Sequence, residues 1–226
     1  MERQFQLELE SLKTSLIKMG SLVEGSYRLA VAAFFEHDRR AGLEVIITDE
    51  RIDSLELEID NAIIDILALR QPVAKDLRFI IGSQKLNNDL ERIGDHCVNL
   101  AQSALTLLDS PGNSTTGGMA KTTVEDIRRM TEIVERMLRD ALDSFIRLDP
   151  KLAEEVLENE QPVDDLNRKT VKLVVESLKA EEISVETGME LARLSRNLER
   201  IADLSTNIAE EVVFLTQARV IKHQGV

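Results

Sequence analysis

The stretch LERIGDHCVNLA, residues 90–101, shows how this chain is organised, because a second copy, LERIADLSTNIA, occupies residues 198–209. Seven of the twelve positions are identical between the two copies, which lie 108 residues apart. A match of this length at a fixed offset indicates an internal duplication. Each copy carries a glutamate and an aspartate four residues apart, a spacing that places both side chains on one face of a helix. We therefore interpret the chain as two copies of a helical unit that presents these carboxylates.

The composition favours long helices. The chain has 226 residues, enough for one large domain or two small ones, with no tryptophan, four prolines and only 3% aromatic residues, which argues against a β-sandwich or barrel. Its net charge of −13 makes non-specific attraction to nucleic acid or to anionic lipid unfavourable. The single cysteine excludes an internal disulfide and fits a reducing compartment.

The first residues, MERQFQLELESLK, lack the apolar core of a signal peptide. A membrane-spanning helix needs a run of about 18 apolar residues, and the sequence contains no such run. We therefore expect a soluble, cytoplasmic protein without direct membrane insertion and without a nucleic-acid partner.

Apolar residues recur at alternating spacings of three and four, which is helical periodicity and predicts six long helices. Ends are expected near His37-Asp38, at Gln71-Pro72 and near residues 179–184, and Asp149-Pro150 supplies an N-cap with a first-turn proline. Three antiparallel helices joined by short loops form a bundle. The sequence thus predicts an all-α fold of two tandem antiparallel three-helix bundles related by an internal pseudo-twofold duplication.

A stretch rich in Gly, Ser and Thr separates the two copies. We place the first three-helix bundle at residues 1–110, the linker at 111–122 and the second three-helix bundle at 123–226. Helices of the predicted size would be roughly 45–50 Å long, so we expect an elongated molecule.

A further acidic pair lies on the second predicted helix of each copy. When that helix folds back about Pro72, the two acidic pairs of the first copy have midpoints 21 residues on either side of the turn, so they lie level. The second copy agrees, with a turn inside residues 179–184. Each bundle is therefore predicted to gather four carboxylates in a layer. The first layer comprises Asp49, Asp53, Glu91 and Asp95, and the second layer comprises Glu160, Asp164, Glu199 and Asp203.

Four neighbouring carboxylates need protons, basic partners or a cation. Two carboxylates about 5 Å apart repel by roughly 3 kcal/mol at an effective dielectric constant near 20, and by less where water screens them. Oxygen-only sets suit hard ions such as Mg²⁺, Mn²⁺, Ca²⁺ or iron, so both layers are candidate metal sites. The alternative interpretation is two solvated faces with Arg51, Arg92, Arg196 and Arg200 as counter-ions.

Other polar residues accompany these stripes. Asn99 and Asn207 extend them by four residues and would serve either as auxiliary oxygen ligands or as hydrogen-bonding groups in helix packing. His96 aligns with Leu204 and is therefore absent from the second copy, which argues against a ligand role. Cys97 lies on the packed seam and is expected to be a small buried residue.

With these motifs in place, the chain resembles the PhoU family of phosphate-uptake regulators. The resemblance rests on the two LERI-x-D helices, on RQPVAKDLR at residues 70–78 and on DERID at residues 49–53, and it covers the whole chain in order. It implies two three-helix bundles with an E/D-x-x-x-D metal motif on the second and third helices of each, which corresponds to the two layers above. It also implies iron, zinc, magnesium or manganese as the bound ion.

The same resemblance implies regulation. Members of the family restrain high-affinity phosphate uptake and keep the phosphate-starvation regulon off when phosphate is plentiful. They act through the ATPase subunit of a phosphate ABC transporter and through a sensor histidine kinase. The resemblance further implies a cytoplasmic homodimer that is peripheral to the inner membrane through those partners.

Two rival interpretations remain. A di-metal carboxylate enzyme on a helical bundle normally uses Glu-x-x-His, but neither Glu91 nor Glu199 is followed by histidine at the third position. The sequence also has no P-loop and no Gly-rich phosphate cradle, so we predict that the protein is not an enzyme. The other rival is a helical adaptor without metal, whose melting temperature a metal would leave unchanged.

Pro162 breaks the symmetry between the copies, because it lies between two carboxylates of the second layer. A proline inside a helix costs about 3 kcal/mol unless it occupies a first turn or a kink. We therefore expect a kink or a local opening there.

Overall fold

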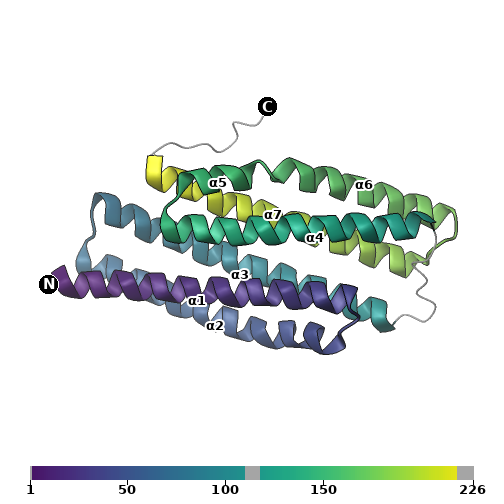
Figure 1. Ribbon diagram of the computed structural model, residues 1–226. Helices are drawn as coiled ribbons and strands as arrows, with labels where there is room; N and C mark the ends of the chain where they lie inside the picture. The colour runs from purple at the N-terminus through teal and green to yellow at the C-terminus, as the bar shows by residue number, and fades with distance from the viewer. Residues whose placement is uncertain (1, 110–117, 218–226) are drawn as a thin grey trace.

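The computed structural model describes residues 2–109 and 118–217, and this part of the chain forms helices without strands (Figure 1). The helices are α1 Glu2–Phe35, α2 Arg39–Arg70, α3 Ala74–Asp109, α4 Gly118–Arg147, α5 Pro150–Leu157, α6 Glu160–Lys179 and α7 Val185–Gln217. None of the helices in this part of the chain combines the length and the apolar character that a membrane span requires.

Local signals in the sequence set the helix ends. Asp38 caps α2 by accepting hydrogen bonds from the backbone N–H groups two and three residues later, at 2.9 and 3.1 Å. Asp149 repeats this cap at α5, where Pro150 begins the helix. Gln71 ends α2 in a left-handed conformation with φ of 47°. These ends confirm the predicted ones.

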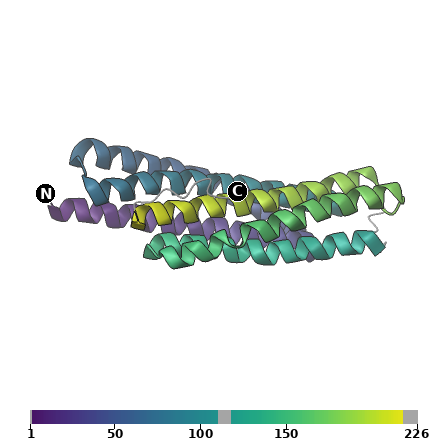
Figure 2. The same cartoon turned by 90° about the horizontal axis from the view of Figure 1, so that it is seen from above.

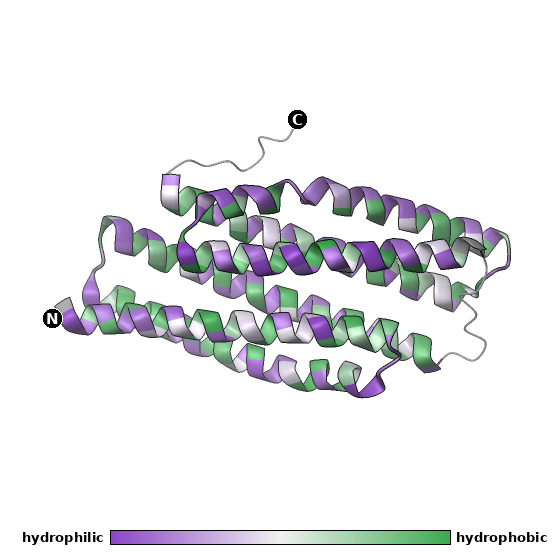
Figure 3. Ribbon diagram, in the orientation of Figure 1, coloured by the Kyte–Doolittle hydropathy of each residue, from purple (hydrophilic) through white to green (hydrophobic). Residues whose placement is uncertain are grey.

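The helices form two antiparallel bundles that lie side by side, with α3 packed along α7 and α1 meeting α4 (Figures 1 and 2). One bundle contains α1, α2 and α3, and the other contains α4, α5, α6 and α7. A single hydrophobic core extends through both bundles. Each helix turns an apolar stripe inward and a polar one outward (Figure 3). The predicted fold class is confirmed.

Reciprocal contacts reveal the pseudo-twofold relation between the copies. On α3, Lys85 Nζ lies 2.6 Å from Glu211 Oε2 of α7. Arg193 on α7 is the equivalent of Lys85, and it donates hydrogen bonds to Asn99 and Gln102 of α3 at 2.9 and 3.4 Å. Contacts that are repeated in this exchanged sense are typical of a twofold axis, here within one chain.

The seam predicted on α3 and α7 is confirmed, since Leu90, Ile93 and Cys97 are buried together with their counterparts. Burial raises the pKa of the Cys97 thiol, as expected for an inert core cysteine. One seam residue was predicted wrongly. Leu69 is 70% exposed, because the buried positions of α2 continue through Ile63 and turn Leu69 outward.

The second copy opens where proline was expected to disturb it. Its second helix consists of α5, which ends at Leu157, and α6, which begins at Glu160. Pro162 is the third residue of α6, in the first turn, where a helix has no intrahelical partner for the backbone N–H that proline lacks. The matching helix of the first copy, α2, is continuous over 32 residues.

The predicted linker at 111–122 lies only partly within the described residues. Helix α4 begins at Gly118, so the end of that stretch is helical. Residues 110–117 lie outside the part that the structure describes. The boundaries of the two predicted domains stay a prediction.

Candidate metal site

The first layer lies on the outer face of α2 and α3, where the two helices approach closely. A β-carbon on Gly94 would lie 3.2 Å from the Ile52 side chain and 3.4 Å from Asp49 Oδ1. Glycine at this position therefore lets α3 approach the carboxylate of α2. Asp49 and Glu91 are half-buried, whereas Asp53 and Asp95 are exposed.

Every electrostatic influence within the first layer is repulsive. Burial raises the pKa of Asp49 to about 6, and the charges of Asp53 and Asp95 add to this effect. Burial also raises the pKa of Glu91, reinforced first by Asp95 and then by Glu56 and the two α2 aspartates. The structure thus brings the four predicted residues of the first layer into one electrostatic cluster.

In the second layer, two arginines offset part of the same repulsion. Arg196 Nη1 lies 2.8 Å from Glu199 Oε1, and Arg200 Nη1 lies 2.8 Å from Asp203 Oδ2. Burial raises the pKa of both carboxyl groups, and the arginines lower it in part. The second layer is therefore partly neutralised by its own chain, as the counter-ion interpretation expected.

Glu160 and Asp164 complete the second layer from α6. Burial raises the pKa of Glu160, and the charges of Asp203 and Asp164 raise it further. Glu199 Oε2 is buried without a hydrogen-bond partner among the described residues, and its nearest cation, Arg200 Nε, lies 3.7 Å away. The layer therefore retains an unsatisfied carboxylate oxygen despite its arginines.

Two sequence differences explain the asymmetry between the layers. Asn88 stands in the first copy where the second has Arg196. Arg92 is the equivalent of Arg200, yet its Nη1 lies 3.8 Å from Asp89 Oδ1, outside the layer. The counterpart of Asp89 is Asn197, which carries no charge to compete for an arginine.

The remaining predicted residues serve mainly to join helices. Asn99 donates to the backbone carbonyl of Asp95 at 3.0 Å and accepts from Arg193 Nη2 at 2.9 Å, so it takes part in packing between the bundles. His96 Nδ1 lies 2.9 Å from Asn197 Oδ1 across the α3–α7 contact. Asn207 is half-buried on α7.

Two acidic residues near the layers were missed from sequence. Burial and the charges of Asp60 and Asp53 raise the pKa of Glu56, which in turn acts on Glu91. Glu210 acts on Glu160 in the same way. Both lie seven residues after a predicted carboxylate, a heptad spacing that continues the same stripe and would have identified them.

The chemistry of both layers is that of oxygen donors held on paired helices. Within residues 2–109 and 118–217, no three Asp, Glu, His or Cys side chains converge closely enough to hold a metal ion as they stand. The raised pKa values of Asp49, Glu91 and Glu160 show that the layers favour an added positive charge. Residues of this kind fit a proton or a hard cation.

Known proteins resemble this chain over nearly its whole length. The PhoU domain family matches residues 16–104 and, a second time, residues 127–212. The phosphate-specific transport system accessory protein PhoU homolog of Pseudomonas putida is 35% identical over 223 residues, 99% of this chain and 84% of that protein. The corresponding homolog of Aquifex aeolicus is 36% identical over 219 residues, 97% of this chain and 96% of that protein.

Solved structures share the fold. The crystal structure of PhoU from Pseudomonas aeruginosa matches with a TM-score of 0.89 and 33% identity, covering 95% of this chain and 100% of that one. The phosphate transport system regulatory protein PhoU from Streptococcus pneumoniae matches with a TM-score of 0.85 and 27% identity, covering 96% and 99%. The two matched segments of the family fall on the two bundles, and this chain therefore belongs to the PhoU family.

Proposed function

We propose that this protein regulates phosphate uptake and phosphate-starvation signalling by binding other proteins. The observation that carries the proposal is the near-full-length similarity to relatives named as accessory proteins of a phosphate-specific transport system. The proposed partners are the ATPase subunit of a phosphate ABC transporter and a sensor histidine kinase. The protein acts as a homodimer in the cytoplasm, peripheral to the inner membrane through these partners, and not as an enzyme.

We further propose that the two carboxylate layers bind cations, with iron, zinc, manganese and magnesium as the candidate ions. The raised pKa values of five carboxyl groups support this, because burial and mutual repulsion are costs that a cation relieves. The ligands are the eight carboxylates of the two layers, with Asn99 and Asn207 as auxiliary oxygen donors. A bound ion supplies positive charge that ties α2 to α3 and α6 to α7. The exposed faces of the braced bundles then contact the partners.

A metal-independent adaptor is the second candidate, and one observation favours it. Arg196 and Arg200 already neutralise part of the second layer without any ion. In that case the layers are charged surfaces for docking, and the regulatory role rests on protein contacts alone.

The test is complementation of a bacterium that lacks its own PhoU-family gene. Phosphate uptake and a reporter under a phosphate-starvation promoter are measured in phosphate-rich medium, alongside binding of the purified protein to the ATPase subunit and to the kinase. We expect the wild type to restore repression and to bind. A well-expressed chain that neither represses nor binds would contradict the regulatory role.

The double variant Asp95→Asn/Asp203→Asn tests the contribution of metal in the same assays. We expect it to lose metal and to repress more weakly than the wild type. If it loses metal but keeps full repression and partner binding, the adaptor interpretation is correct.

A further inference from the structure

Each copy of the repeat exposes three apolar side chains near the tip of one helical hairpin. The α2–α3 hairpin exposes them to between 38% and 60%, and the α6–α7 hairpin to between 43% and 66%. Exposed large apolar side chains that cluster mark interaction surfaces more often than scattered ones do. Tip 1 consists of Ile64, Leu77 and Ile81, and tip 2 consists of Val175, Val185 and Met189.

The two tips occupy equivalent positions of the duplication. The first member of each lies at an offset of 111, and the other two members lie at an offset of 108. Other exposed apolar residues are not repeated in this way. Leu43 and Ile47 are exposed on α2, but their counterparts are Glu154 and Glu158. Exposed apolar character is thus duplicated at the tips and absent from the second copy at this control pair.

The helix register gathers each triplet into one patch. Gln84 Nε2 donates to Asp60 Oδ1 at 2.7 Å, so these residues lie level, twelve positions on either side of Pro72. The same register places Ile64 beside Ile81, with Leu77 one turn nearer the loop. The equivalent turn between α6 and α7 places Val175 beside Met189.

Charge is also repeated at the tips. An acidic residue follows the apolar residue on the first helix of each hairpin, Asp65 after Ile64 and Glu176 after Val175. Each tip therefore combines an apolar patch with a carboxylate, and the chain as a whole carries a charge of −13. A surface that complements it is an apolar pocket with basic residues at its rim.

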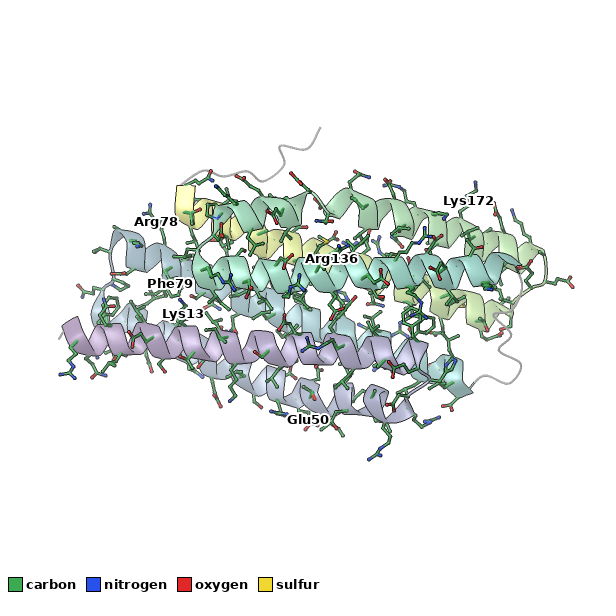
Figure 4. The ribbon with its side chains drawn as sticks, in the orientation of Figure 1. Lys13, Glu50, Arg78, Phe79, Arg136 and Lys172 are labelled. Atoms are coloured by element: carbon green, nitrogen blue, oxygen red, sulfur yellow. The ribbon has the colours of Figure 1, made fainter. Side chains whose placement is uncertain are left out.

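The tips lie at opposite ends of the molecule, close to Arg78 and Lys172 in Figure 4 (Figures 1 and 4). The contact between His96 and Asn197 places Val185 level with residue 108 of α3. That position is 31 residues from Leu77, or about 45 Å along the helix. A twofold rotation leaves direction along its axis unchanged, so both tips face the same way along that axis.

We propose that tips 1 and 2 dock together on one two-fold symmetric protein partner, each in one of two equivalent apolar pockets with basic rims, about 45 Å apart. The inference rests on the proposed function, in that the protein acts by binding a protein partner. The pseudo-twofold axis of this single chain then coincides with the axis of the partner dimer. One chain contacts both subunits at once.

Two-point binding has a measurable signature. The second contact is intramolecular once the first has formed, which raises affinity by about 10²- to 10⁴-fold over one contact. Loss of either tip should therefore weaken binding by about 100-fold or more. It should also change the stoichiometry from one chain per partner dimer to two, because each chain then occupies a single pocket.

The experiment uses the full chain and the dimeric ATPase subunit of the proposed function, followed by isothermal titration calorimetry. The tip 1 variant carries Ile64→Gln, Leu77→Gln and Ile81→Gln. The tip 2 variant carries Val175→Gln, Val185→Gln and Met189→Gln. The control variant carries Leu43→Gln and Ile47→Gln, and unchanged circular dichroism and melting temperature verify folding of every variant.

We expect both single-tip variants to bind weakly at two chains per dimer, the combined variant not to bind, and the control to match the wild type. If the combined variant binds as tightly as the wild type, the inference fails while the proposed function stands. Loss of affinity through one tip alone would also overturn it. If the wild type binds neither the ATPase nor the kinase dimer, the proposed function fails together with the inference.

Self-association is examined by sedimentation of the same variants. If the wild type is a dimer, the combined variant is a monomer and binding to the partner is unchanged, then the tips are a surface between copies of this chain. That result would overturn the inference.

Discussion

The first and second carboxylate layers descend from one duplicated unit, but they balance their charge differently. In the second layer Arg196 and Arg200 pair with two of the carboxylates. In the first layer the corresponding arginine turns to Asp89, and the carboxylates act mainly on one another. A layer that carries its own counter-ions gains less from a cation than one that does not. We therefore expect the first layer to bind metal more tightly.

The largest expected effect is on metal content. Glu91→Gln with Asp95→Asn should lower the affinity of the first layer for Mn²⁺ by about 100-fold or more, since it removes two of its charged oxygen donors. The matched pair Glu199→Gln with Asp203→Asn should remove only a weaker site. Elemental analysis of protein purified without chelator or affinity tag, and Mn²⁺ titration, provide the measurement. Equal affinity of the two layers would refute the comparison, and no metal in the wild type would leave the layers as charged docking surfaces.

Exchanging the arginine pattern should exchange the affinities. Asn88→Arg with Asp89→Asn gives the first layer the polar neighbours of the second, and we expect its Mn²⁺ affinity to fall by about tenfold, equivalent to about 1.4 kcal/mol. Arg196→Asn should raise the affinity of the second layer by a similar factor. Arg51→Gln is the control, because Arg51 is exposed on α2 outside the ion pairs of both layers among the described residues. Unchanged affinities in the exchanged proteins would show that the arginines do not set the difference.

Without metal, the first layer should destabilise the fold as pH rises. Because the pKa of Asp49 in the folded protein is about 6, against 3.8 for the ordinary carboxyl, the folded state binds more protons between these values. The free energy of unfolding then falls as pH increases from about 4 to 6, and the penalty is fully present above pH 6. Asp49→Asn should therefore stabilise the metal-free protein at pH 7 by about 1–2 kcal/mol after allowance for solvent screening.

Urea unfolding of chelator-treated protein between pH 4 and 8 measures this effect. The variant should show a flatter pH dependence than the wild type, and Asp164→Asn in the second layer serves as the comparison. A variant that is less stable than the wild type at pH 7 without metal would contradict the repulsion inferred for the first layer.

The smallest expected effect concerns the broken helix of the second copy. Pro162→Ala should change the free energy of unfolding by less than about 1 kcal/mol, because the proline lies in the first turn of α6. Gln161→Ala, one residue earlier, is the control for the change in helix propensity. A gain near 3 kcal/mol on thermal or urea unfolding would mean that Pro162 interrupts a helix interior.

Much of the architecture was predictable because it depends on local signals. Caps such as Asp38 and Asp149 set helix ends, and the repeated seam at Leu90 and Leu198 set the core of each bundle. The level placement of the acidic pairs followed from counting residues on either side of Pro72.

The rest depends on choices that periodicity does not resolve. Arg92 can reach an acidic residue three positions before or after it, and only the folded surroundings select Asp89. The contact between His96 and Asn197, and the hydrogen bond from Tyr27 Oη to the carbonyl of Thr131 at 2.9 Å, join separate bundles. Such pairs lie about a hundred residues apart, and the sequence pattern of one bundle does not indicate which face meets the other.

The shared core and the exchanged contacts between α3 and α7 make this molecule a tethered dimer of half-length units. Cleavage between Asp109 and Gly118 should leave the two fragments associated, because Gly82 admits Leu215 at the contact and the core passes from one bundle into the other. Separately expressed fragments should complement each other when mixed. A fragment on its own would expose the face of α3 or α7 and pair with itself, which makes the covalent connection a device for keeping two diverged halves matched.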